Sequence, residues 1–139
     1  MNIAIVGFDY DFTRELAQKI SEKLSISFVD FKEHFEKFLL SNNSSIFQEN
    51  EILNNFETKM FKQICVEDNV VVSFPDDVVL SNKNYKYLKN NLILFINSQN
   101  NNKIQLNLKK LIKNINIEIN KENYNFEDII KKIRGFYDR

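Results

Sequence analysis

Residues 2–30 read NIAIVGFDYDFTRELAQKISEKLSISFVD and contain the pattern that decides the fold. Asn2–Gly7 is a short apolar run ending in glycine, which is typical of a buried parallel strand. The apolar side chains of the next segment recur four residues apart and predict an amphipathic helix, at Phe12, Leu16, Ile20 and Leu24. Ile26–Val29 is a second apolar run, ending at Asp30. A strand, a helix and a strand in this order predict two parallel strands joined by a crossover helix.

The same alternation continues along the chain. Further apolar runs predict strands at Val70–Phe74, Leu92–Ile96 and Ile115–Ile119. Helical patterns occupy Phe31–Leu39, Ile52–Ile64, Asn84–Lys89, Lys103–Lys113 and Phe126–Tyr137, and the Asn/Ser cluster Ser41–Ser45 breaks the first of them. We therefore predict one α/β domain over residues 1–139, with three α/β/α layers and a five-stranded parallel sheet.

Ligands of such folds bind beyond the carboxyl ends of the strands. We expect the site to be built from the segments that start at Phe8, Asp30, Pro75 and Asn97, where Pro75-Asp76-Asp77 ends the third strand.

Composition limits the class of protein. The chain has 139 residues and is 43% hydrophobic, enough for a core without disulfides or metal. Its single cysteine, Cys65, excludes a disulfide framework. No run of apolar residues is long enough to span a membrane. Because the first strand follows Met1 directly, we expect no signal peptide and a cytoplasmic location.

The charges cancel overall but are unevenly distributed. Residues 1–80 hold 7 Lys/Arg and 14 Asp/Glu, so the remaining 12 and 5 lie in residues 81–139. This split is consistent with two halves that attract each other, or with a nucleic-acid face around Lys103–Lys113 and Lys131–Arg134. The lysines are spaced along predicted helices and do not form one stripe, which favours the first interpretation.

The order and spacing of these elements resemble the shikimate kinase family, within the nucleoside-monophosphate-kinase group of P-loop proteins. Thr13–Lys37 aligns without a gap to the family's first helix, second strand and Asp-x-Asp segment, and Asn69–Ser98 matches its third strand to its fourth. The resemblance implies the strand order 2-3-1-4-5.

The family's phosphate loop, GxxGxGK[ST], corresponds here to Gly7–Arg14, which reads GFDYDFTR. Only the first glycine is kept. The other two glycines, the lysine and the magnesium-binding hydroxyl residue are replaced, in that order, by Tyr10, Phe12, Thr13 and Arg14. Non-glycine residues resist the positive φ angles of such a loop. Asp9 and Asp11 add two negative charges where a triphosphate would lie, so we expect ATP to be repelled.

The substrate positions of the family also differ. Asp30 keeps the first acid of Asp-x-Asp, but Lys32 replaces the second, and Leu53 stands near the family's substrate arginine. Pro75-Asp76-Asp77 replaces the glycine turn, and the lid is reduced to Asn97–Asn102. The candidate pocket residues are Gly7, Asp9, Asp11, Thr13, Arg14, Asp30, Lys32, Ser73, Asp76 and Asp77.

These losses predict a non-catalytic relative of shikimate kinase, a pseudokinase that serves as a binding or regulatory module without a cofactor. Its partner would be a protein or a small ligand, and a homodimer is compatible with the sequence. We expect Phe8, Tyr10 and Phe12 to fill the former nucleotide site, the alternative being that they present a partner surface.

A second hypothesis treats the same loop as an active site. Asp9-Tyr10-Asp11-Phe12-Thr13 matches DxDx[TV], the motif of haloacid-dehalogenase-type phosphatases, in which Asp9 would be the nucleophile and Asp11 the acid/base beside Mg²⁺. Ser73 would bind phosphate. The further acidic pair of that family is missing after Leu92–Ile96.

The sequence also predicts that five aspartates converge at one sheet edge: Asp9, Asp11, Asp30, Asp76 and Asp77. They would form either a divalent-cation site, with Asp9, Asp11 and Asp30 as ligands, or a solvated rim balanced by Arg14 and Lys32. We favour the rim.

Overall fold

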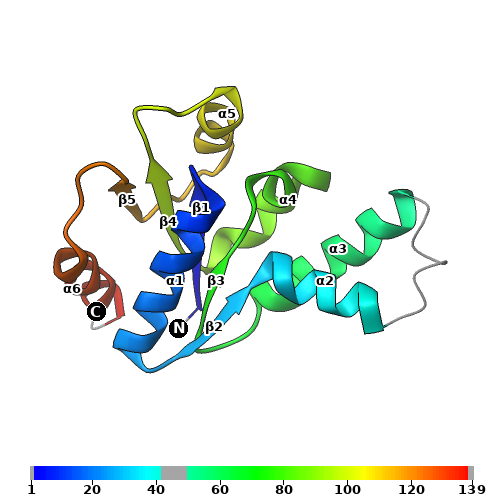
Figure 1. The fold of residues 1–139 in the computed structure, drawn as a ribbon, viewed down its shortest axis with the longest axis horizontal. Coiled ribbons are helices and arrows are strands. Elements are labelled where there is room, and N and C mark those ends of the chain that lie inside the picture. The colour runs from blue at the N-terminus through cyan, green and yellow to red at the C-terminus, as the bar shows by residue number, and fades with distance from the viewer. Residues whose placement is uncertain (1, 42–49, 138–139) are drawn as a thin grey trace.

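The computed structural model describes residues 2–41 and 50–137 (Figure 1). The strands are β1 (Asn2–Gly7), β2 (Ser27–Asp30), β3 (Val70–Ser73), β4 (Leu92–Asn97) and β5 (Ile117–Asn120). The α-helices are α1 (Tyr10–Leu24), α2 (Phe31–Ser41), α3 (Asn50–Cys65), α4 (Asp76–Leu80), α5 (Lys103–Leu111) and α6 (Phe126–Tyr137), and a 3₁₀ segment, η2, covers Ser81–Asn90.

The strands form one parallel sheet in the order β2-β3-β1-β4-β5. β1 is central, and its residue Ile3 pairs with Val71 of β3 on one side and with Leu92 of β4 on the other. The predicted fold class and strand order are therefore confirmed.

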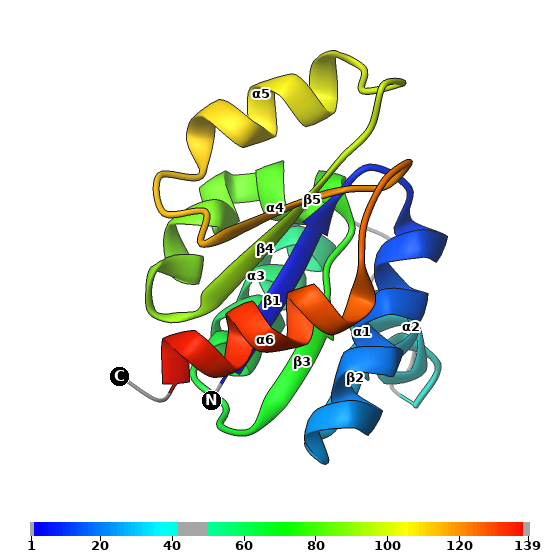
Figure 2. The same cartoon turned by 90° about the vertical axis from the view of Figure 1, so that its left-hand side faces the viewer.

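Helices cover both faces of this sheet (Figure 2). Side chains alternate along β1, so that Ala4 and Val6 belong to the core under α3, α4, η2 and α5. Ile3 and Ile5 belong to the core under α1 and α6. Figure 1 shows α2 and α3 extending together past the β2 edge of the sheet.

Several predicted boundaries change, and β2, β3 and β4 differ from the predicted strands by one residue at one or both ends. Pro75-Asp76-Asp77 is not a simple turn, because Pro75 is the N-cap of α4 and its fixed φ of −65° suits a helix start. The predicted helix at Asn84–Lys89 is part of the longer 3₁₀ segment. The basic helix predicted to reach Lys113 ends at Leu111.

The last strand begins at Ile117 and excludes Ile115, which packs into the core of the opposite face. Just before the strand, the side-chain oxygen of Asn116 accepts a hydrogen bond from the N–H of Ile93 at 2.8 Å. α2 ends at Ser41, and the rest of the predicted break, residues 42–45, lies outside the described residues. None of the helices in the described ranges has the length and hydropathy needed to cross a membrane.

Candidate functional site

The loop between β1 and α1 begins at Gly7, whose backbone N–H is already bonded within the chain. It donates to Oδ1 of Asp76 at 3.0 Å, and Nε2 of Gln105 donates to Oδ2 of the same carboxylate at 2.8 Å. Burial raises the pKa of Asp76, and these two hydrogen bonds oppose part of that rise. A carboxylate from the start of α4 therefore ties β1 to α5.

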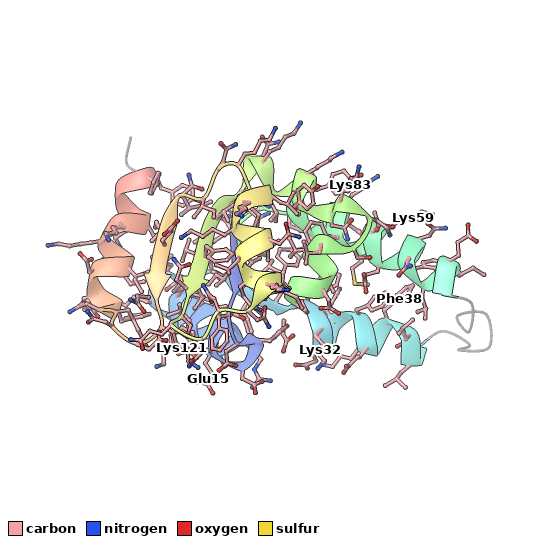
Figure 3. All side chains as sticks on the ribbon, turned by 90° about the horizontal axis from the view of Figure 1, so that it is seen from above. Glu15, Lys32, Phe38, Lys59, Lys83 and Lys121 are labelled. Carbon is pink, nitrogen blue, oxygen red and sulfur yellow. The ribbon has the colours of Figure 1, made fainter. Side chains whose placement is uncertain are left out.

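Asp9 is the N-cap of α1, with φ of 69° and its Oδ1 accepting from the N–H of Phe12 at 3.4 Å. Its Oδ2 lies 2.7 Å from Nζ of Lys121, a residue that follows β5 and is labelled in Figure 3. The hydrogen bond from Lys121 lowers the pKa of Asp9. The same ammonium group lies 5.2 Å from the ring centre of Phe8 and 5.7 Å from that of Phe12. This contact closes the loop against the C-terminal part of the chain.

Tyr10 points toward the ends of β2 and β3. Its hydroxyl donates to the carboxylate of Asp30, lies 3.3 Å from Oγ of Ser73, and accepts from the N–H of Lys32 at 3.3 Å. Burial, followed by the bond to Asp30, raises the pKa of Tyr10. Oδ1 of Asp30 also accepts from the N–H of Glu33 at 3.2 Å at the start of α2. One aromatic side chain thus connects three elements.

The side-chain functional groups of Thr13, Asp11 and Arg14 make no hydrogen bond to Asp30 or Ser73, the side-chain partners of the Tyr10 hydroxyl. Thr13 is fully buried, and its hydroxyl donates to the carbonyl of Tyr10 at 2.9 Å. Asp11 and Arg14 are exposed and pair with each other at 3.5 Å.

The five aspartates therefore lie at or after the ends of β1, β2 and β3, as predicted, but they do not form one cluster. Asp9, Asp30 and Asp76 each have a different partner in a different part of the edge. Within the described residues, no three His, Cys, Asp or Glu side chains are grouped so that they could hold a metal ion. The predicted solvated rim had Arg14 and Lys32 as its counter-charges. In the structure Arg14 pairs with Asp11, but the cation paired with Asp9 is Lys121.

A cavity of about 350 Å³ lies between α2, α3 and the segment after β3. Apolar side chains of Phe31, Phe35 and Val78 line it together with the carboxylates of Glu36, Glu57 and Asp77, and it is also bounded by Tyr10, Lys32 and Pro75. Burial, and then the charge of Asp77, raises the pKa of Glu57. An adjoining cavity of about 320 Å³ places Lys32 beside Asp11, Arg14 and Asp30 (Lys32 is labelled in Figure 3).

Several site residues were not predicted, among them Lys121, Glu57 and Gln105. Lys121 could have been found, because it follows β5 at the same edge as the other loops. Glu57 lies one helical turn after Leu53 on α3, so the helix period could have identified it. Gln105 gives no sequence signal beyond its position in the capping box of α5.

Comparisons with known proteins agree with this fold. The family model described as shikimate kinase matches residues 14–133. A shikimate kinase of Thermodesulfovibrio yellowstonii is 24% identical over 140 residues, covering 99% of this chain and 81% of that protein. A bifunctional shikimate kinase/3-dehydroquinate synthase of Thermotoga maritima is 31% identical over 98 residues, 69% of this chain but 20% of that protein.

Two solved structures show the same fold. The shikimate kinase of Aquifex aeolicus superposes with a TM-score of 0.75 at 17% identity, covering 99% of this chain and 96% of that one. The shikimate kinase of Bacteroides thetaiotaomicron gives a TM-score of 0.71 at 13% identity, with coverage of 100% and 99%. The family match over most of the chain, together with this fold, confirms the predicted resemblance. The chain belongs to the shikimate kinase family.

Proposed function

We propose that this member of the shikimate kinase family is a non-catalytic binding or regulatory module that does not bind ATP at the loop after β1. The main observation in support is the hydrogen bond that the N–H of Gly7 donates to the carboxylate of Asp76. Phosphate loops bind anions through such backbone N–H groups at the start of a helix. In this chain an internal anion already accepts from the first of them.

The loop also opposes a triphosphate electrostatically. Phosphate oxygens would have to displace Asp76 from Gly7 and break the 2.7 Å ion pair between Asp9 and Lys121. A phosphate charge placed about 4 Å from an unpaired carboxylate is disfavoured by roughly 4 kcal/mol at the effective dielectric constant of a protein surface. The side chain of Tyr10 and the pair Asp9–Lys121 support the prediction that the former nucleotide site is filled from within.

The second support is the character of the cavity beside α3. Glu36, Glu57 and Asp77 bring three carboxylates to its wall, and Leu53 replaces the arginine that the family resemblance would supply. A substrate with a carboxylate would meet like charge at this wall, where Lys32 is the one cation among the described lining residues and no arginine offers a guanidinium partner.

Two measurements test the proposal. Calorimetric titration with MgATP should give no heat above dilution, and incubation with MgATP and shikimate should give no phosphorylated product. The shikimate kinase of Thermodesulfovibrio yellowstonii serves as the positive control in both. ATP binding in the micromolar range, or kinase activity that co-elutes with the chain on size exclusion, would show that the family's activity persists.

The phosphatase alternative stays a prediction, and the contacts of its two aspartates do not favour it. Asp9 is paired with Lys121 and Asp11 with Arg14. The alternative requires Mg²⁺-dependent hydrolysis of p-nitrophenyl phosphate that Asp9→Asn abolishes.

A further inference from the structure

A cavity of about 570 Å³ lies at the end of the sheet opposite to the Gly7 loop. It is bounded by η2 and by the C-terminal end of α5, and it reaches Ile93 at the start of β4. Four lysines line it, Lys86, Lys89, Lys110 and Lys113. We call this site the lysine groove.

The sequence around the groove carries charge of one sign. Residues 78–117 contain seven lysines and no aspartate or glutamate. Other basic residues of the C-terminal half do have acidic partners, as in Lys109–Glu118 and Lys132–Asp128. Within the described part of the chain, by contrast, none of the four groove lysines forms an ion pair. Their positive charge is therefore not neutralised by the fold.

The floor of the groove is apolar. Ile93 is 1% exposed and Ile112 is 5% exposed, and both belong to the core beneath the groove. Tyr85 and Leu111 add partly exposed apolar surface. Ammonium groups around an apolar floor match a ligand that combines an apolar body with several anionic groups, and the volume is within the range of small-molecule sites.

The shape of the basic surface argues against nucleic acid as the occupant. Lys131 and Arg134 lie on α6, whose buried side packs against the sheet face opposite to the one that carries α5. The basic residues of the C-terminal half therefore fall on two faces and do not form the continuous stripe that a polynucleotide backbone requires.

We propose that the lysine groove binds a small organic anion, with an apolar ring or chain and at least two carboxylate, phosphate or sulfonate groups. Lys86 and Lys89 contact the anionic groups from η2, and Lys110 and Lys113 from α5 and the segment after it. The apolar body covers Ile93 and Ile112. The groove shares no lining residue with the loop after β1. The proposal for the groove is therefore tested independently of the proposed loss of ATP binding.

The probe is bis-ANS, an apolar aromatic dianion, added to the full chain and followed by fluorescence. We expect saturable binding to one site, and competition by mellitate, an aromatic ring carrying six carboxylates. The double substitution Lys110→Glu with Lys113→Glu should weaken binding about tenfold or more, because it removes two charge-assisted contacts and adds repulsion. The matched control is Lys131→Glu with Arg134→Glu, which changes the net charge equally on α6 and should leave binding within about twofold.

Backbone amide shifts in ¹⁵N-labelled chain provide a second readout that does not depend on variants. Binding should move the resonances of Tyr85, Ile93 and Ile112 and leave those of Gly7 and Asp9 unchanged. The milder variant Lys86→Gln keeps the test valid if the double reversal does not fold. Equal weakening in both double variants, equally tight binding of the neutral dye N-phenyl-1-naphthylamine, or shifts confined to the Gly7 loop would each overturn the proposal.

Discussion

Gly7 and Gly135 are the only glycines of this chain, and we predict that alanine at these two positions changes stability in opposite directions. Gly7 ends β1 with φ of +127°, a conformation that residues with a Cβ rarely adopt. A Cβ added there would lie 2.4 Å from the carbonyl oxygen of Ile96 and 2.6 Å from its nitrogen. Both atoms belong to the backbone of β4, so no side-chain rotation relieves the contact.

The cost of Gly7→Ala has two parts. The strained φ costs about 1–3 kcal/mol. Moving β1 away from β4 adds roughly 1–3 kcal/mol of overpacking strain. That movement also stretches the 3.0 Å hydrogen bond from the N–H of Phe8 to Ile96. We expect a total loss of about 2–6 kcal/mol, which lowers the melting temperature by roughly 6–24 °C in a domain of this size.

Gly135 lies within α6, and no atom comes within 4 Å of the position that a Cβ would take there, so Gly135→Ala should stabilise the chain by about 0.5–1 kcal/mol. Urea and thermal unfolding followed by circular dichroism measure both variants against the unchanged chain. Folding free energies are typically about 5–15 kcal/mol. If the unfolding free energy of Gly7→Ala lies within about 1 kcal/mol of that of the unchanged chain, the close approach of β1 and β4 is not what requires glycine.

Three smaller perturbations test the surroundings of the site. Tyr10→Phe should cost about 1–2 kcal/mol in urea unfolding, because Asp30 loses its hydroxyl donor, and a cost near zero would mean that water replaces the bond. Glu57→Gln should raise the melting temperature at pH 7 but not at pH 3. Burial and the charge of Asp77 raise the pKa of Glu57 in the folded chain above its ordinary 4.5. The stability contributed by protonated Glu57 is therefore fully present below pH 4.5 and is lost as the pH rises through the folded pKa. An equal gain in melting temperature at pH 3 and pH 7 contradicts this. Cys65 is 6% exposed and burial raises the pKa of its thiol to about 12, so Ellman's reagent at pH 8 should label it only at the rate of unfolding, and immediate labelling of folded chain would be inconsistent with this packing.

The sheet could be predicted well because buried parallel strands are continuous apolar runs. β1 has the predicted bounds, Asn2–Gly7. Prediction failed where the same short sequence is compatible with two local structures. Pro75-Asp76-Asp77 is compatible with a turn and with the start of a helix, and the structure has the helix. Ile115 continues the alternation of β5, yet pairing with β4 decides where the strand begins.

The candidate site was harder to predict than the fold, because its contacts join residues that are distant in sequence. Asp76 was predicted as a pocket residue, and its bonds to Gly7 and Gln105 cross 69 and 29 positions of the chain. Local spacing carries no information on such pairs. Charge alone suggested a shared acidic cluster, whereas the tertiary structure gives Asp9, Asp30 and Asp76 separate donors.

The contacts that, on the proposed function, oppose ATP also hold the carboxyl edge of the sheet together. Tyr10 joins α1 to the ends of β2 and β3, Lys121 joins the loop after β5 to Asp9, and Asp76 joins β1 to α5. Replacing Tyr10 by the family's glycine would leave the carboxylate of Asp30 without its hydroxyl donor and would add backbone freedom to the first turn of α1. Restoring the family's loop sequence therefore lowers stability before it can restore a phosphate site. We infer that the altered loop is a structural part of this chain, so that on the proposed function a phosphate site there would require compensating changes at Asp30, Asp76 and Lys121 as well.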